Sequence, residues 1–306
     1  MALMVAIGIA IVVGSLTLLR DHLEAEKEAS MAIRDPIVAY KADAEVEQAK
    51  NALVAGVQSA EVITTLQDGS RRIALVFDGM PDAAAATQIL NVLKKHNTPA
   101  VFFVEGQNAV DQPGTIQQIR DAGYEIGNYT FVGISAVEKI RTDRLLEELC
   151  RAQKGIREAG APAPALFRAP RTEYTDDVLR LVRAAGIPQA VKASAYYPKD
   201  GVKDAAAALA YAGALPPGSI LSIRLTEPVD RYAPRQVTPN ERPAIDMQPT
   251  IKDPEGGGAP AAPVVRQPLA KDLDLFLTAC EGVGLQVESV HAFRTIHYVP
   301  NLVAKE

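Results

Sequence analysis

The sequence predicts an α/β fold, because short apolar runs typical of strands alternate with segments of helical periodicity. The predicted strands cover residues 73–78, 100–104, 124–128, 165–168, 189–193, 218–224 and 285–290. The predicted helices cover residues 82–95, 114–122, 142–158, 176–185, 203–211 and 269–281. Such alternation is typical of βα units on a parallel sheet or barrel with the helices outside. Functional side chains then lie on the loops after the carboxyl ends of the strands.

The composition is that of an ordinary globular protein. Of the 306 residues, 48% are hydrophobic and 23% are charged, which is enough apolar material for a core. The net charge of −5 gives no basic excess, so nucleic acid is not an expected partner. Cys150 and Cys280 could form one disulfide in an exported chain, but buried free cysteines are common, and we favour unpaired thiols.

The amino-terminal segment predicts a membrane anchor. Residues 2–19, ALMVAIGIAIVVGSLTLL, contain no charge, and their length is close to the roughly 20 residues that span a bilayer. A secretory signal peptide is the alternative. No basic region precedes the run and no A-x-A cleavage pattern directly follows it, so we favour an uncleaved anchor over residues 1–20.

The anchor is followed by a predicted stalk and then by a predicted hairpin. Residues 21–59 are polar and rich in alanine, and they predict a juxtamembrane helical stalk without chemistry. Residues 60–66 and 71–78 are rich in strand-forming residues, and the Asp68-Gly69 pair between them favours the tight turn of a β-hairpin. We expect the main domain to cover residues 60–295.

A proline-rich segment interrupts the predicted domain. Residues 227–268 contain many prolines and a run of glycines at 256–258, with too little apolar periodicity for a core. We therefore predict an extended, mobile insertion there. Residues 296–306 are predicted to form a short tail.

Five segments, in order, resemble the polysaccharide deacetylases, the NodB-homology enzymes of carbohydrate esterase family 4. The segments are IALVFDGMPDAAAATQILNVLKKHNTPAVFFVEGQNA, GYEIGNYTF, ALFRAPRTEYTDDVLRLVRAAG, PPGSILSIRL and GLQVESVHAF, which together span residues 73–293. The resemblance implies a distorted (β/α) barrel with an active groove at the strand ends. It also implies a substrate such as chitin, peptidoglycan or xylan.

The same resemblance shows that the family's metal ligands are replaced. The family holds a divalent metal such as zinc with one aspartate and two histidines, and uses a second aspartate as base. Its first motif, T-F-D-D-G-P-D, reads V-F-D-G-M-P-D here, so Asp78 matches the base and Gly79 matches the metal ligand. Its second motif, H-[ST]-x-x-H, aligns its histidines with Tyr129 and Gly133. We therefore expect no metal cofactor.

The later motifs are preserved only in part. The family's R-x-P-Y reads Arg168-Ala169-Pro170-Arg171, so Arg168 matches the partner of the base and Arg171 replaces a tyrosine of the groove. The position of the acid histidine aligns with Arg224. No segment matches the fourth motif clearly; residues 192–197 lie there instead.

Each candidate has two interpretations. Asp78 and Arg168 are either a working catalytic pair or an ion pair left from ancestry, and an adjacent arginine makes a carboxylate a weaker base. Arg171 and Arg224 either converge with Arg168 on an anionic ligand, or face solvent and pair with nearby acids.

The predicted ligand-binding residues are Tyr129, Pro170, Arg171 and Arg224. Tyrosines at 129, 174, 196 and 197 are candidates for stacking on sugar rings, although tyrosine is also an everyday packing residue.

We expect a membrane-anchored, catalytically degenerate deacetylase that binds cell-envelope polysaccharide or peptidoglycan. The alternatives are an active hydrolase of C–N bonds in carbohydrates with altered chemistry, and a structural membrane partner that docks through the proline-rich segment. A single-pass anchor with an extracytoplasmic domain suits the envelope substrate. The basic residues Arg20, Lys27, Arg34 and Lys41 argue for the opposite orientation under the positive-inside rule.

Overall fold

The computed structural model describes residues 40–66, 68–229 and 269–296. The elements below belong to one compact unit. The predicted anchor and most of the predicted insertion and tail lie outside the described residues. Among the residues that are described, no helix combines the length and the apolar character needed to cross a membrane.

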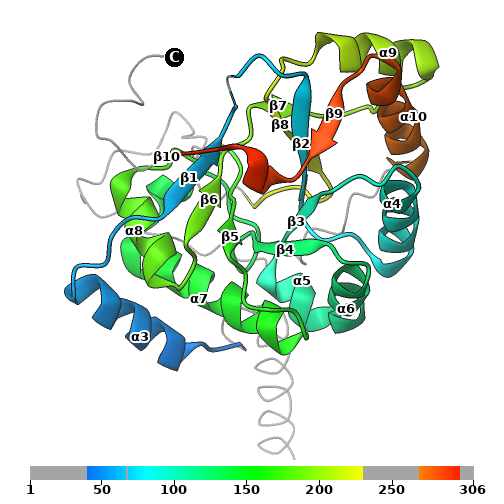
Figure 1. Ribbon diagram of the computed structural model, residues 1–306. Helices are drawn as coiled ribbons and strands as arrows, with labels where there is room; N and C mark the ends of the chain where they lie inside the picture. Colours follow the sequence, from blue (N-terminus) through cyan, green and yellow to red (C-terminus); the bar gives the residue numbers. More distant parts are fainter. Residues whose placement is uncertain (1–39, 67, 230–268, 297–306) are drawn as a thin grey trace, which may run out of the picture. The chain divides into compact units, whose positions relative to one another are not determined.

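The strands form a curled sheet with the helices on its outside (Figure 1). The strands are β1 (Glu61–Thr64), β2 (Arg72–Asp78), β3 (Val101–Val104), β4 (Glu125–Asn128), β5 (Leu166–Phe167), β6 (Gln189–Val191), β7 (Ala195–Tyr196), β8 (Ile220–Arg224), β9 (Gln286–Glu288) and β10 (Arg294–Ile296). Their order is β10-β1-β6-β5-β4-β3-β2-β8-β7, with β9 also pairing with β2. The pairing of β1 with β10 is antiparallel, and the other pairs are parallel. The predicted alternation of strands and helices is confirmed.

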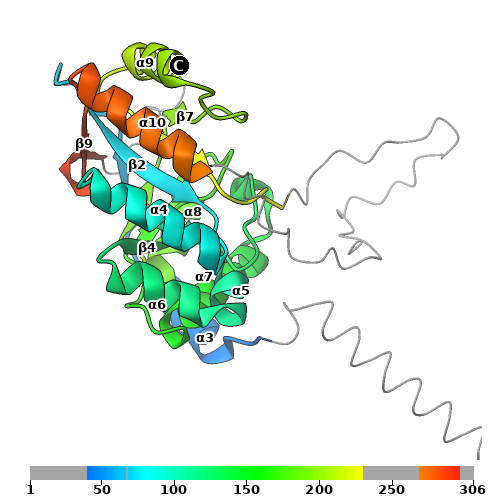
Figure 2. The same cartoon turned by 90° about the vertical axis from the view of Figure 1, so that its right-hand side faces the viewer.

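Except for α3 and α5, the described helices begin and end near the predicted positions. They are α3 (Asp43–Val54), α4 (Ala83–Lys95), α5 (Gly106–Asp111), α6 (Pro113–Asp121), α7 (Thr142–Glu158), α8 (Asp176–Ala184), α9 (Ala205–Ala214) and α10 (Leu269–Gly282). The carboxylate of Asp82 fixes the start of α4 by accepting a hydrogen bond of 2.8 Å from the Ala85 N–H, as expected for an N-cap. Figure 2 shows α10, α4 and α6 side by side against the sheet.

The two faces of each strand pack into different parts of the core. On β2, Ile73, Leu75 and Phe77 point outward to the cluster that includes α4 and α10. Ala74 and Val76 belong to the cluster inside the curl of the sheet. Since side chains alternate along a strand, Asp78 falls on the inner face at the carboxyl end of β2. The same alternation places Ser222 and Arg224 on the inner face of β8 with Ile220.

The predicted hairpin is wrong. β1 pairs with β6 and β10, whereas β2 pairs with β3, β8 and β9. The tight turn itself exists: Gly69 has φ 75° and the Asp68 carboxylate accepts a hydrogen bond of 3.0 Å from the Ser70 N–H. A turn signal specifies a local reversal of the chain, but the buried parallel neighbours decide which strands pair.

The folded unit begins before residue 60, the expected start of the domain. Helix α3, within the predicted stalk, packs against α7 and α8 and buries Ala42 and Ala49. At the other boundary, Val229 lies within the predicted insertion, yet its N–H donates a hydrogen bond of 2.9 Å to the Gly133 carbonyl.

Both cysteines are buried and free. Cys280, on α10, belongs to the core cluster that also includes residues of α4. Cys150, on α7, belongs to a different cluster that also includes residues of α8. Burial raises the pKa of each thiol to about 12. Neither thiol is therefore placed for a disulfide or for thiolate chemistry.

The close contact between α5 and α7 generates a test of this packing. A Cβ atom at Gly106 would lie 2.4 Å from the Ala152 Cα, whereas a Cβ atom at Gly114 would meet nothing within 4 Å. We expect Gly106→Ala to lower the free energy of unfolding by about 1–3 kcal/mol through overpacking. The control Gly114→Ala should cause little loss in the same urea titration of the full chain. Equal stabilities of the two variants would contradict the close helix contact.

Candidate functional site

A buried ion pair occupies the inner face of the sheet at the carboxyl ends of the strands. Asp78 ends β2, and Arg168 directly follows β5. Arg168 Nε lies 2.6 Å from Asp78 Oδ1, and Arg168 Nη2 lies 3.0 Å from Asp78 Oδ2. Ser222 Oγ, on β8, donates a further hydrogen bond of 2.7 Å to Asp78 Oδ2. Both charged side chains are 3% exposed.

The Asp78 carboxylate keeps Arg168 charged. Burial opposes the guanidinium charge, but the attraction and hydrogen bonds of Asp78 together outweigh burial and raise the pKa of Arg168. Three donors occupy the two oxygens of Asp78. These donors fix the orientation of the Asp78 carboxylate.

The position after Asp78 has no room for a side chain. Gly79 has φ 101°, and a Cβ atom there would lie 2.0 Å from Thr226 Oγ1 and 2.8 Å from Thr226 Cβ. Thr226 is itself buried, and its hydroxyl donates a hydrogen bond to Glu105 Oε1. The Thr226 side chain therefore fills the space that a longer residue at position 79 would need.

Glu105 is the buried acid that completes this packing. It follows β3 and precedes α5, and it is 4% exposed. Its Oε2 accepts hydrogen bonds from the Met80 N–H at 2.9 Å and from Asn108 Nδ2 at 3.1 Å. Burial raises the pKa of Glu105, and these hydrogen bonds only partly oppose the rise. Glu105 was not predicted from the sequence, although an acid directly after a buried strand was the available signal.

Tyr129 and Gly133 are packed against the same acid. Tyr129 is 0% exposed and belongs to the core inside the sheet. Its hydroxyl has no hydrogen-bond partner among the described residues. Burial, reinforced by the charge of Asp78, raises the pKa of Tyr129 well above its usual value. A Cβ atom at Gly133 would lie 3.1 Å from Glu105 Cγ.

These residues do not fit a metal held by one carboxylate and two imidazoles. Glycines and a buried, protonated tyrosine stand at the three positions that the motifs align with the ligands, and neutral tyrosine is a poor ligand for zinc. Within residues 40–66, 68–229 and 269–296, no three His, Cys, Asp or Glu side chains are grouped to hold a metal ion.

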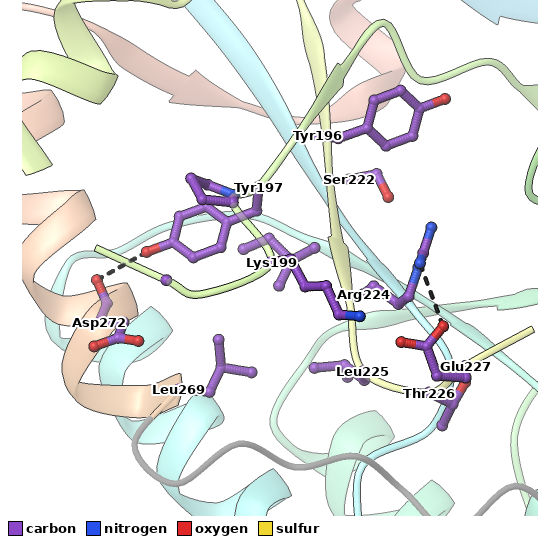
Figure 3. A pocket seen from close by; sticks show the side chains of 13 residues that line it. Tyr196, Tyr197, Lys199, Ser222, Arg224, Leu225, Thr226, Glu227, Leu269 and Asp272 are labelled. Carbon is purple, nitrogen blue, oxygen red and sulfur yellow. Dashed lines mark hydrogen bonds and ion pairs between the residues drawn. The ribbon is translucent and has the colours of Figure 1, made fainter. Parts of the chain in front are cut away.

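A pocket of about 260 Å³ lies at the carboxyl ends of β7 and β8 (Figure 3). Its lining residues are Tyr196, Tyr197, Pro198, Lys199, Gly201, Ser222, Ile223, Arg224, Leu225, Thr226, Glu227, Leu269 and Asp272. Arg224 is 43% exposed, and its Nη1 lies 3.4 Å from Glu227 Oε2. Arg224 is therefore exposed and paired with a nearby acid, Glu227, which is the second of its two interpretations. Ser222 and Thr226 connect the pocket to the buried groups around Asp78 and Glu105.

Of the four residues predicted to bind ligand, only Arg224 lines this pocket. Tyr129 is buried in the core inside the sheet. Pro170 is also buried, and its carbonyl accepts a hydrogen bond of 3.0 Å from the Ala136 N–H. Arg171 lies in a left-handed turn with φ 51°, and its Nη2 donates to Ser135 Oγ at 3.1 Å. That turn directs Arg171 to Ser135 instead of into the pocket.

The four tyrosines considered for sugar stacking differ in their exposure to solvent. Tyr174 is buried and donates a hydrogen bond of 3.1 Å to the Val191 carbonyl, so it is a packing residue. Tyr197 is half-buried and donates to the Asp272 carbonyl at 3.2 Å. Tyr196 is 58% exposed and is the one of the four with an open ring.

Residues 66–190 match the family model of polysaccharide deacetylases. This match places residues 66–190 with the polysaccharide deacetylases. Among curated relatives, a chitooligosaccharide deacetylase from Bradyrhizobium sp. (strain ANU 289) is 32% identical over 120 residues, which are 39% of this chain and 54% of the relative. A peptidoglycan-N-acetylglucosamine deacetylase from Bacillus cereus is 31% identical over 108 residues, which are 35% of this chain and 39% of the relative. The chain thus spans about half or less of the length of these relatives.

Solved structures of polysaccharide deacetylases share the fold. Bacillus subtilis PdaA, a family 4 carbohydrate esterase, has a TM-score of 0.54 at 21% identity, covering 80% of this chain and 88% of that chain. A wild-type family 4 pseudoenzyme from Bacillus anthracis has a TM-score of 0.55 at 16% identity, covering 78% of this chain and 70% of that chain. The predicted NodB-like (β/α) fold is therefore confirmed.

The buried ion pair predicts an asymmetric response to substitution. We expect Arg168→Met to lower the free energy of unfolding by about 3–5 kcal/mol, because Asp78 would be left buried without its partner. Replacing both residues, as Asp78→Leu with Arg168→Met, should restore much of the loss. The exposed ion pair of Arg141 with Asp143 provides the control variant Arg141→Met, which should change stability little. A small effect of Arg168→Met alone in urea titrations would contradict the pairing.

Proposed function

We propose that this chain is a catalytically degenerate polysaccharide deacetylase that binds a cell-envelope glycan without hydrolysing it. We further propose that residues 2–19 anchor it in the membrane and that the domain lies on the extracytoplasmic side. The proposal rests first on the packing at Gly79, because Thr226 fills the space that the metal-binding aspartate of the family would need.

Two further roles in the family's reaction, activation of water and general acid catalysis, have no suitable group here. Metal activation lowers the pKa of bound water from 15.7 to roughly 7, and the side chains around Asp78 supply no equivalent. The acid position holds Arg224, which cannot give up a proton near neutral pH. General acid catalysis contributes about 10²- to 10⁴-fold, so this change alone would remove a large part of the rate.

Glycan binding is supported by the retained pocket and by the relatives. The pocket lies at the carboxyl ends of the strands, where ligands bind in βα folds. The curated relatives are named as deacetylases of peptidoglycan-N-acetylglucosamine and of chitooligosaccharide. A family 4 pseudoenzyme is among the structures that share this fold.

Binding and turnover can be measured on the same preparation. The full chain, purified in detergent, should bind peptidoglycan or chitooligosaccharides. It should release no acetate from their acetylated forms, with or without added zinc, cobalt or nickel. Metal-stimulated acetate release that disappears in Asp78→Asn would contradict the proposal and favour an active hydrolase. Absence of glycan binding together with a co-purifying protein partner would favour a structural role.

Rebuilding the family's ligands tests the role of Thr226. We expect the triple variant Gly79→Asp, Tyr129→His, Gly133→His to bind zinc poorly, because Thr226 blocks the new carboxylate at position 79. Adding Thr226→Gly should raise zinc affinity by at least about tenfold, roughly the value of one hydrogen bond to a charged group. Thr226→Gly alone is the control, and calorimetric zinc titrations give the affinities. Equal affinities of the triple and quadruple variants would contradict the steric argument.

A further inference from the structure

Two cationic side chains in the pocket are not used by the buried pair at Asp78. Arg224 reaches Glu227 only at 3.4 Å, and these side chains are 43% and 46% exposed, so this ion pair is loose. Lys199 is exposed and makes no ion pair or hydrogen bond with a described residue. Figure 3 shows the Lys199 ammonium group and the Arg224 guanidinium group directed toward the same part of the pocket, near Glu227.

Glu227 marks where an anionic group would bind. Its carboxylate accepts from a guanidinium group that has donors available for a second, bidentate partner. Both residues lie at the end of β8 and both are open to solvent, so a ligand carboxylate could take the place of Glu227 on Arg224. The other acid of the pocket, Asp272, lies on its far side beside Tyr197 (Figure 3).

The rest of the pocket suits a single sugar ring. Tyr196 has an exposed ring at the pocket, and its backbone carbonyl is held by a hydrogen bond of 2.8 Å from the Tyr211 hydroxyl. An aromatic face offers apolar contact area to the C–H groups of a pyranose. Leu225 and Leu269 add apolar lining. The volume of about 260 Å³ is below the roughly 300–1,000 Å³ of drug-sized sites, which leaves room for about one monosaccharide.

We propose that this pocket recognises a sugar unit that bears a carboxylate. Arg224 and Lys199 would bind the carboxylate, and Tyr196 would stack on the ring. This inference rests on the proposed function, because it names the class of glycan that the degenerate site accepts. The carboxylate could come from a uronic acid of an acidic polysaccharide or from the lactyl group of muramic acid in peptidoglycan.

Three probes distinguish these sources by calorimetry on the full chain in detergent. They are trigalacturonate, an N-acetylglucosamine–N-acetylmuramic acid disaccharide, and neutral chitotriose. We expect one of the acidic probes to bind at least about tenfold more tightly than chitotriose at low salt, with the preference shrinking at high salt. The acidic probe that binds more tightly identifies the source of the carboxylate.

Substitutions in the pocket should move affinity in opposite directions. Arg224→Gln and Lys199→Gln should each weaken the acidic probe by about tenfold or more, as expected for lost hydrogen bonds to a charged group. Glu227→Gln should strengthen its binding, because the internal competitor is removed. Tyr196→Ala should weaken all three probes. Lys94→Gln, an exposed lysine on α4, is the control and should change nothing.

The outcomes separate this inference from the proposed function. Equal binding of neutral and acidic probes, unchanged by Arg224→Gln, would overturn the carboxylate pocket and leave glycan binding intact. Failure of every probe to bind, together with failure to bind peptidoglycan, would overturn both. Acidic preference together with metal-stimulated acetate release would support the pocket and overturn catalytic degeneracy.

Discussion

The buried ion pair between Asp78 and Arg168 is the constraint around which the candidate site is organised. Each side chain is 3% exposed, so neither charge is tolerable without the other. The pair joins the end of β2 to the residue after β5, and Ser222 extends it to β8. The relative positions of three strand ends are thereby tied together. The same interaction fixes the orientation of the Asp78 carboxylate.

Next to this pair, protein atoms fill the space beside Gly79. Gly79 supplies no side chain, and Thr226 packs against it and donates a hydrogen bond to Glu105. Glu105 in turn accepts from the backbone of Met80. Thr226, Glu105 and the Met80 backbone thus form a buried, hydrogen-bonded group, as expected for polar groups in a core. The one unsatisfied group of this region is the buried Tyr129 hydroxyl, which has no described partner.

Most of the helices and strands could be predicted from the sequence, because the spacing of apolar residues follows the buried face of each element. β2 and α7 begin and end within one residue of the predicted positions. The partners of β1 were not predictable, because the Asp68-Gly69 turn says nothing about strands far away in the chain. Helix α5 was missed because its 6 residues are too few for a periodic signal. Motif alignment identified Asp78 and Arg168 correctly as partners. Glu105 and Thr226 belong to no motif, and their contact depends on a tertiary fold that brings residues 121 positions apart together.

The pocket beside this packed region carries exposed charges and an exposed aromatic ring. What most directly tests this arrangement is a crystal structure of the chain grown with excess zinc, with anomalous data collected at the zinc edge. We expect the Thr226 hydroxyl on Glu105 and no anomalous peak beside Asp78. An anomalous peak bound by Asp78 or Glu105, with Thr226 displaced, would contradict the proposed loss of the metal site.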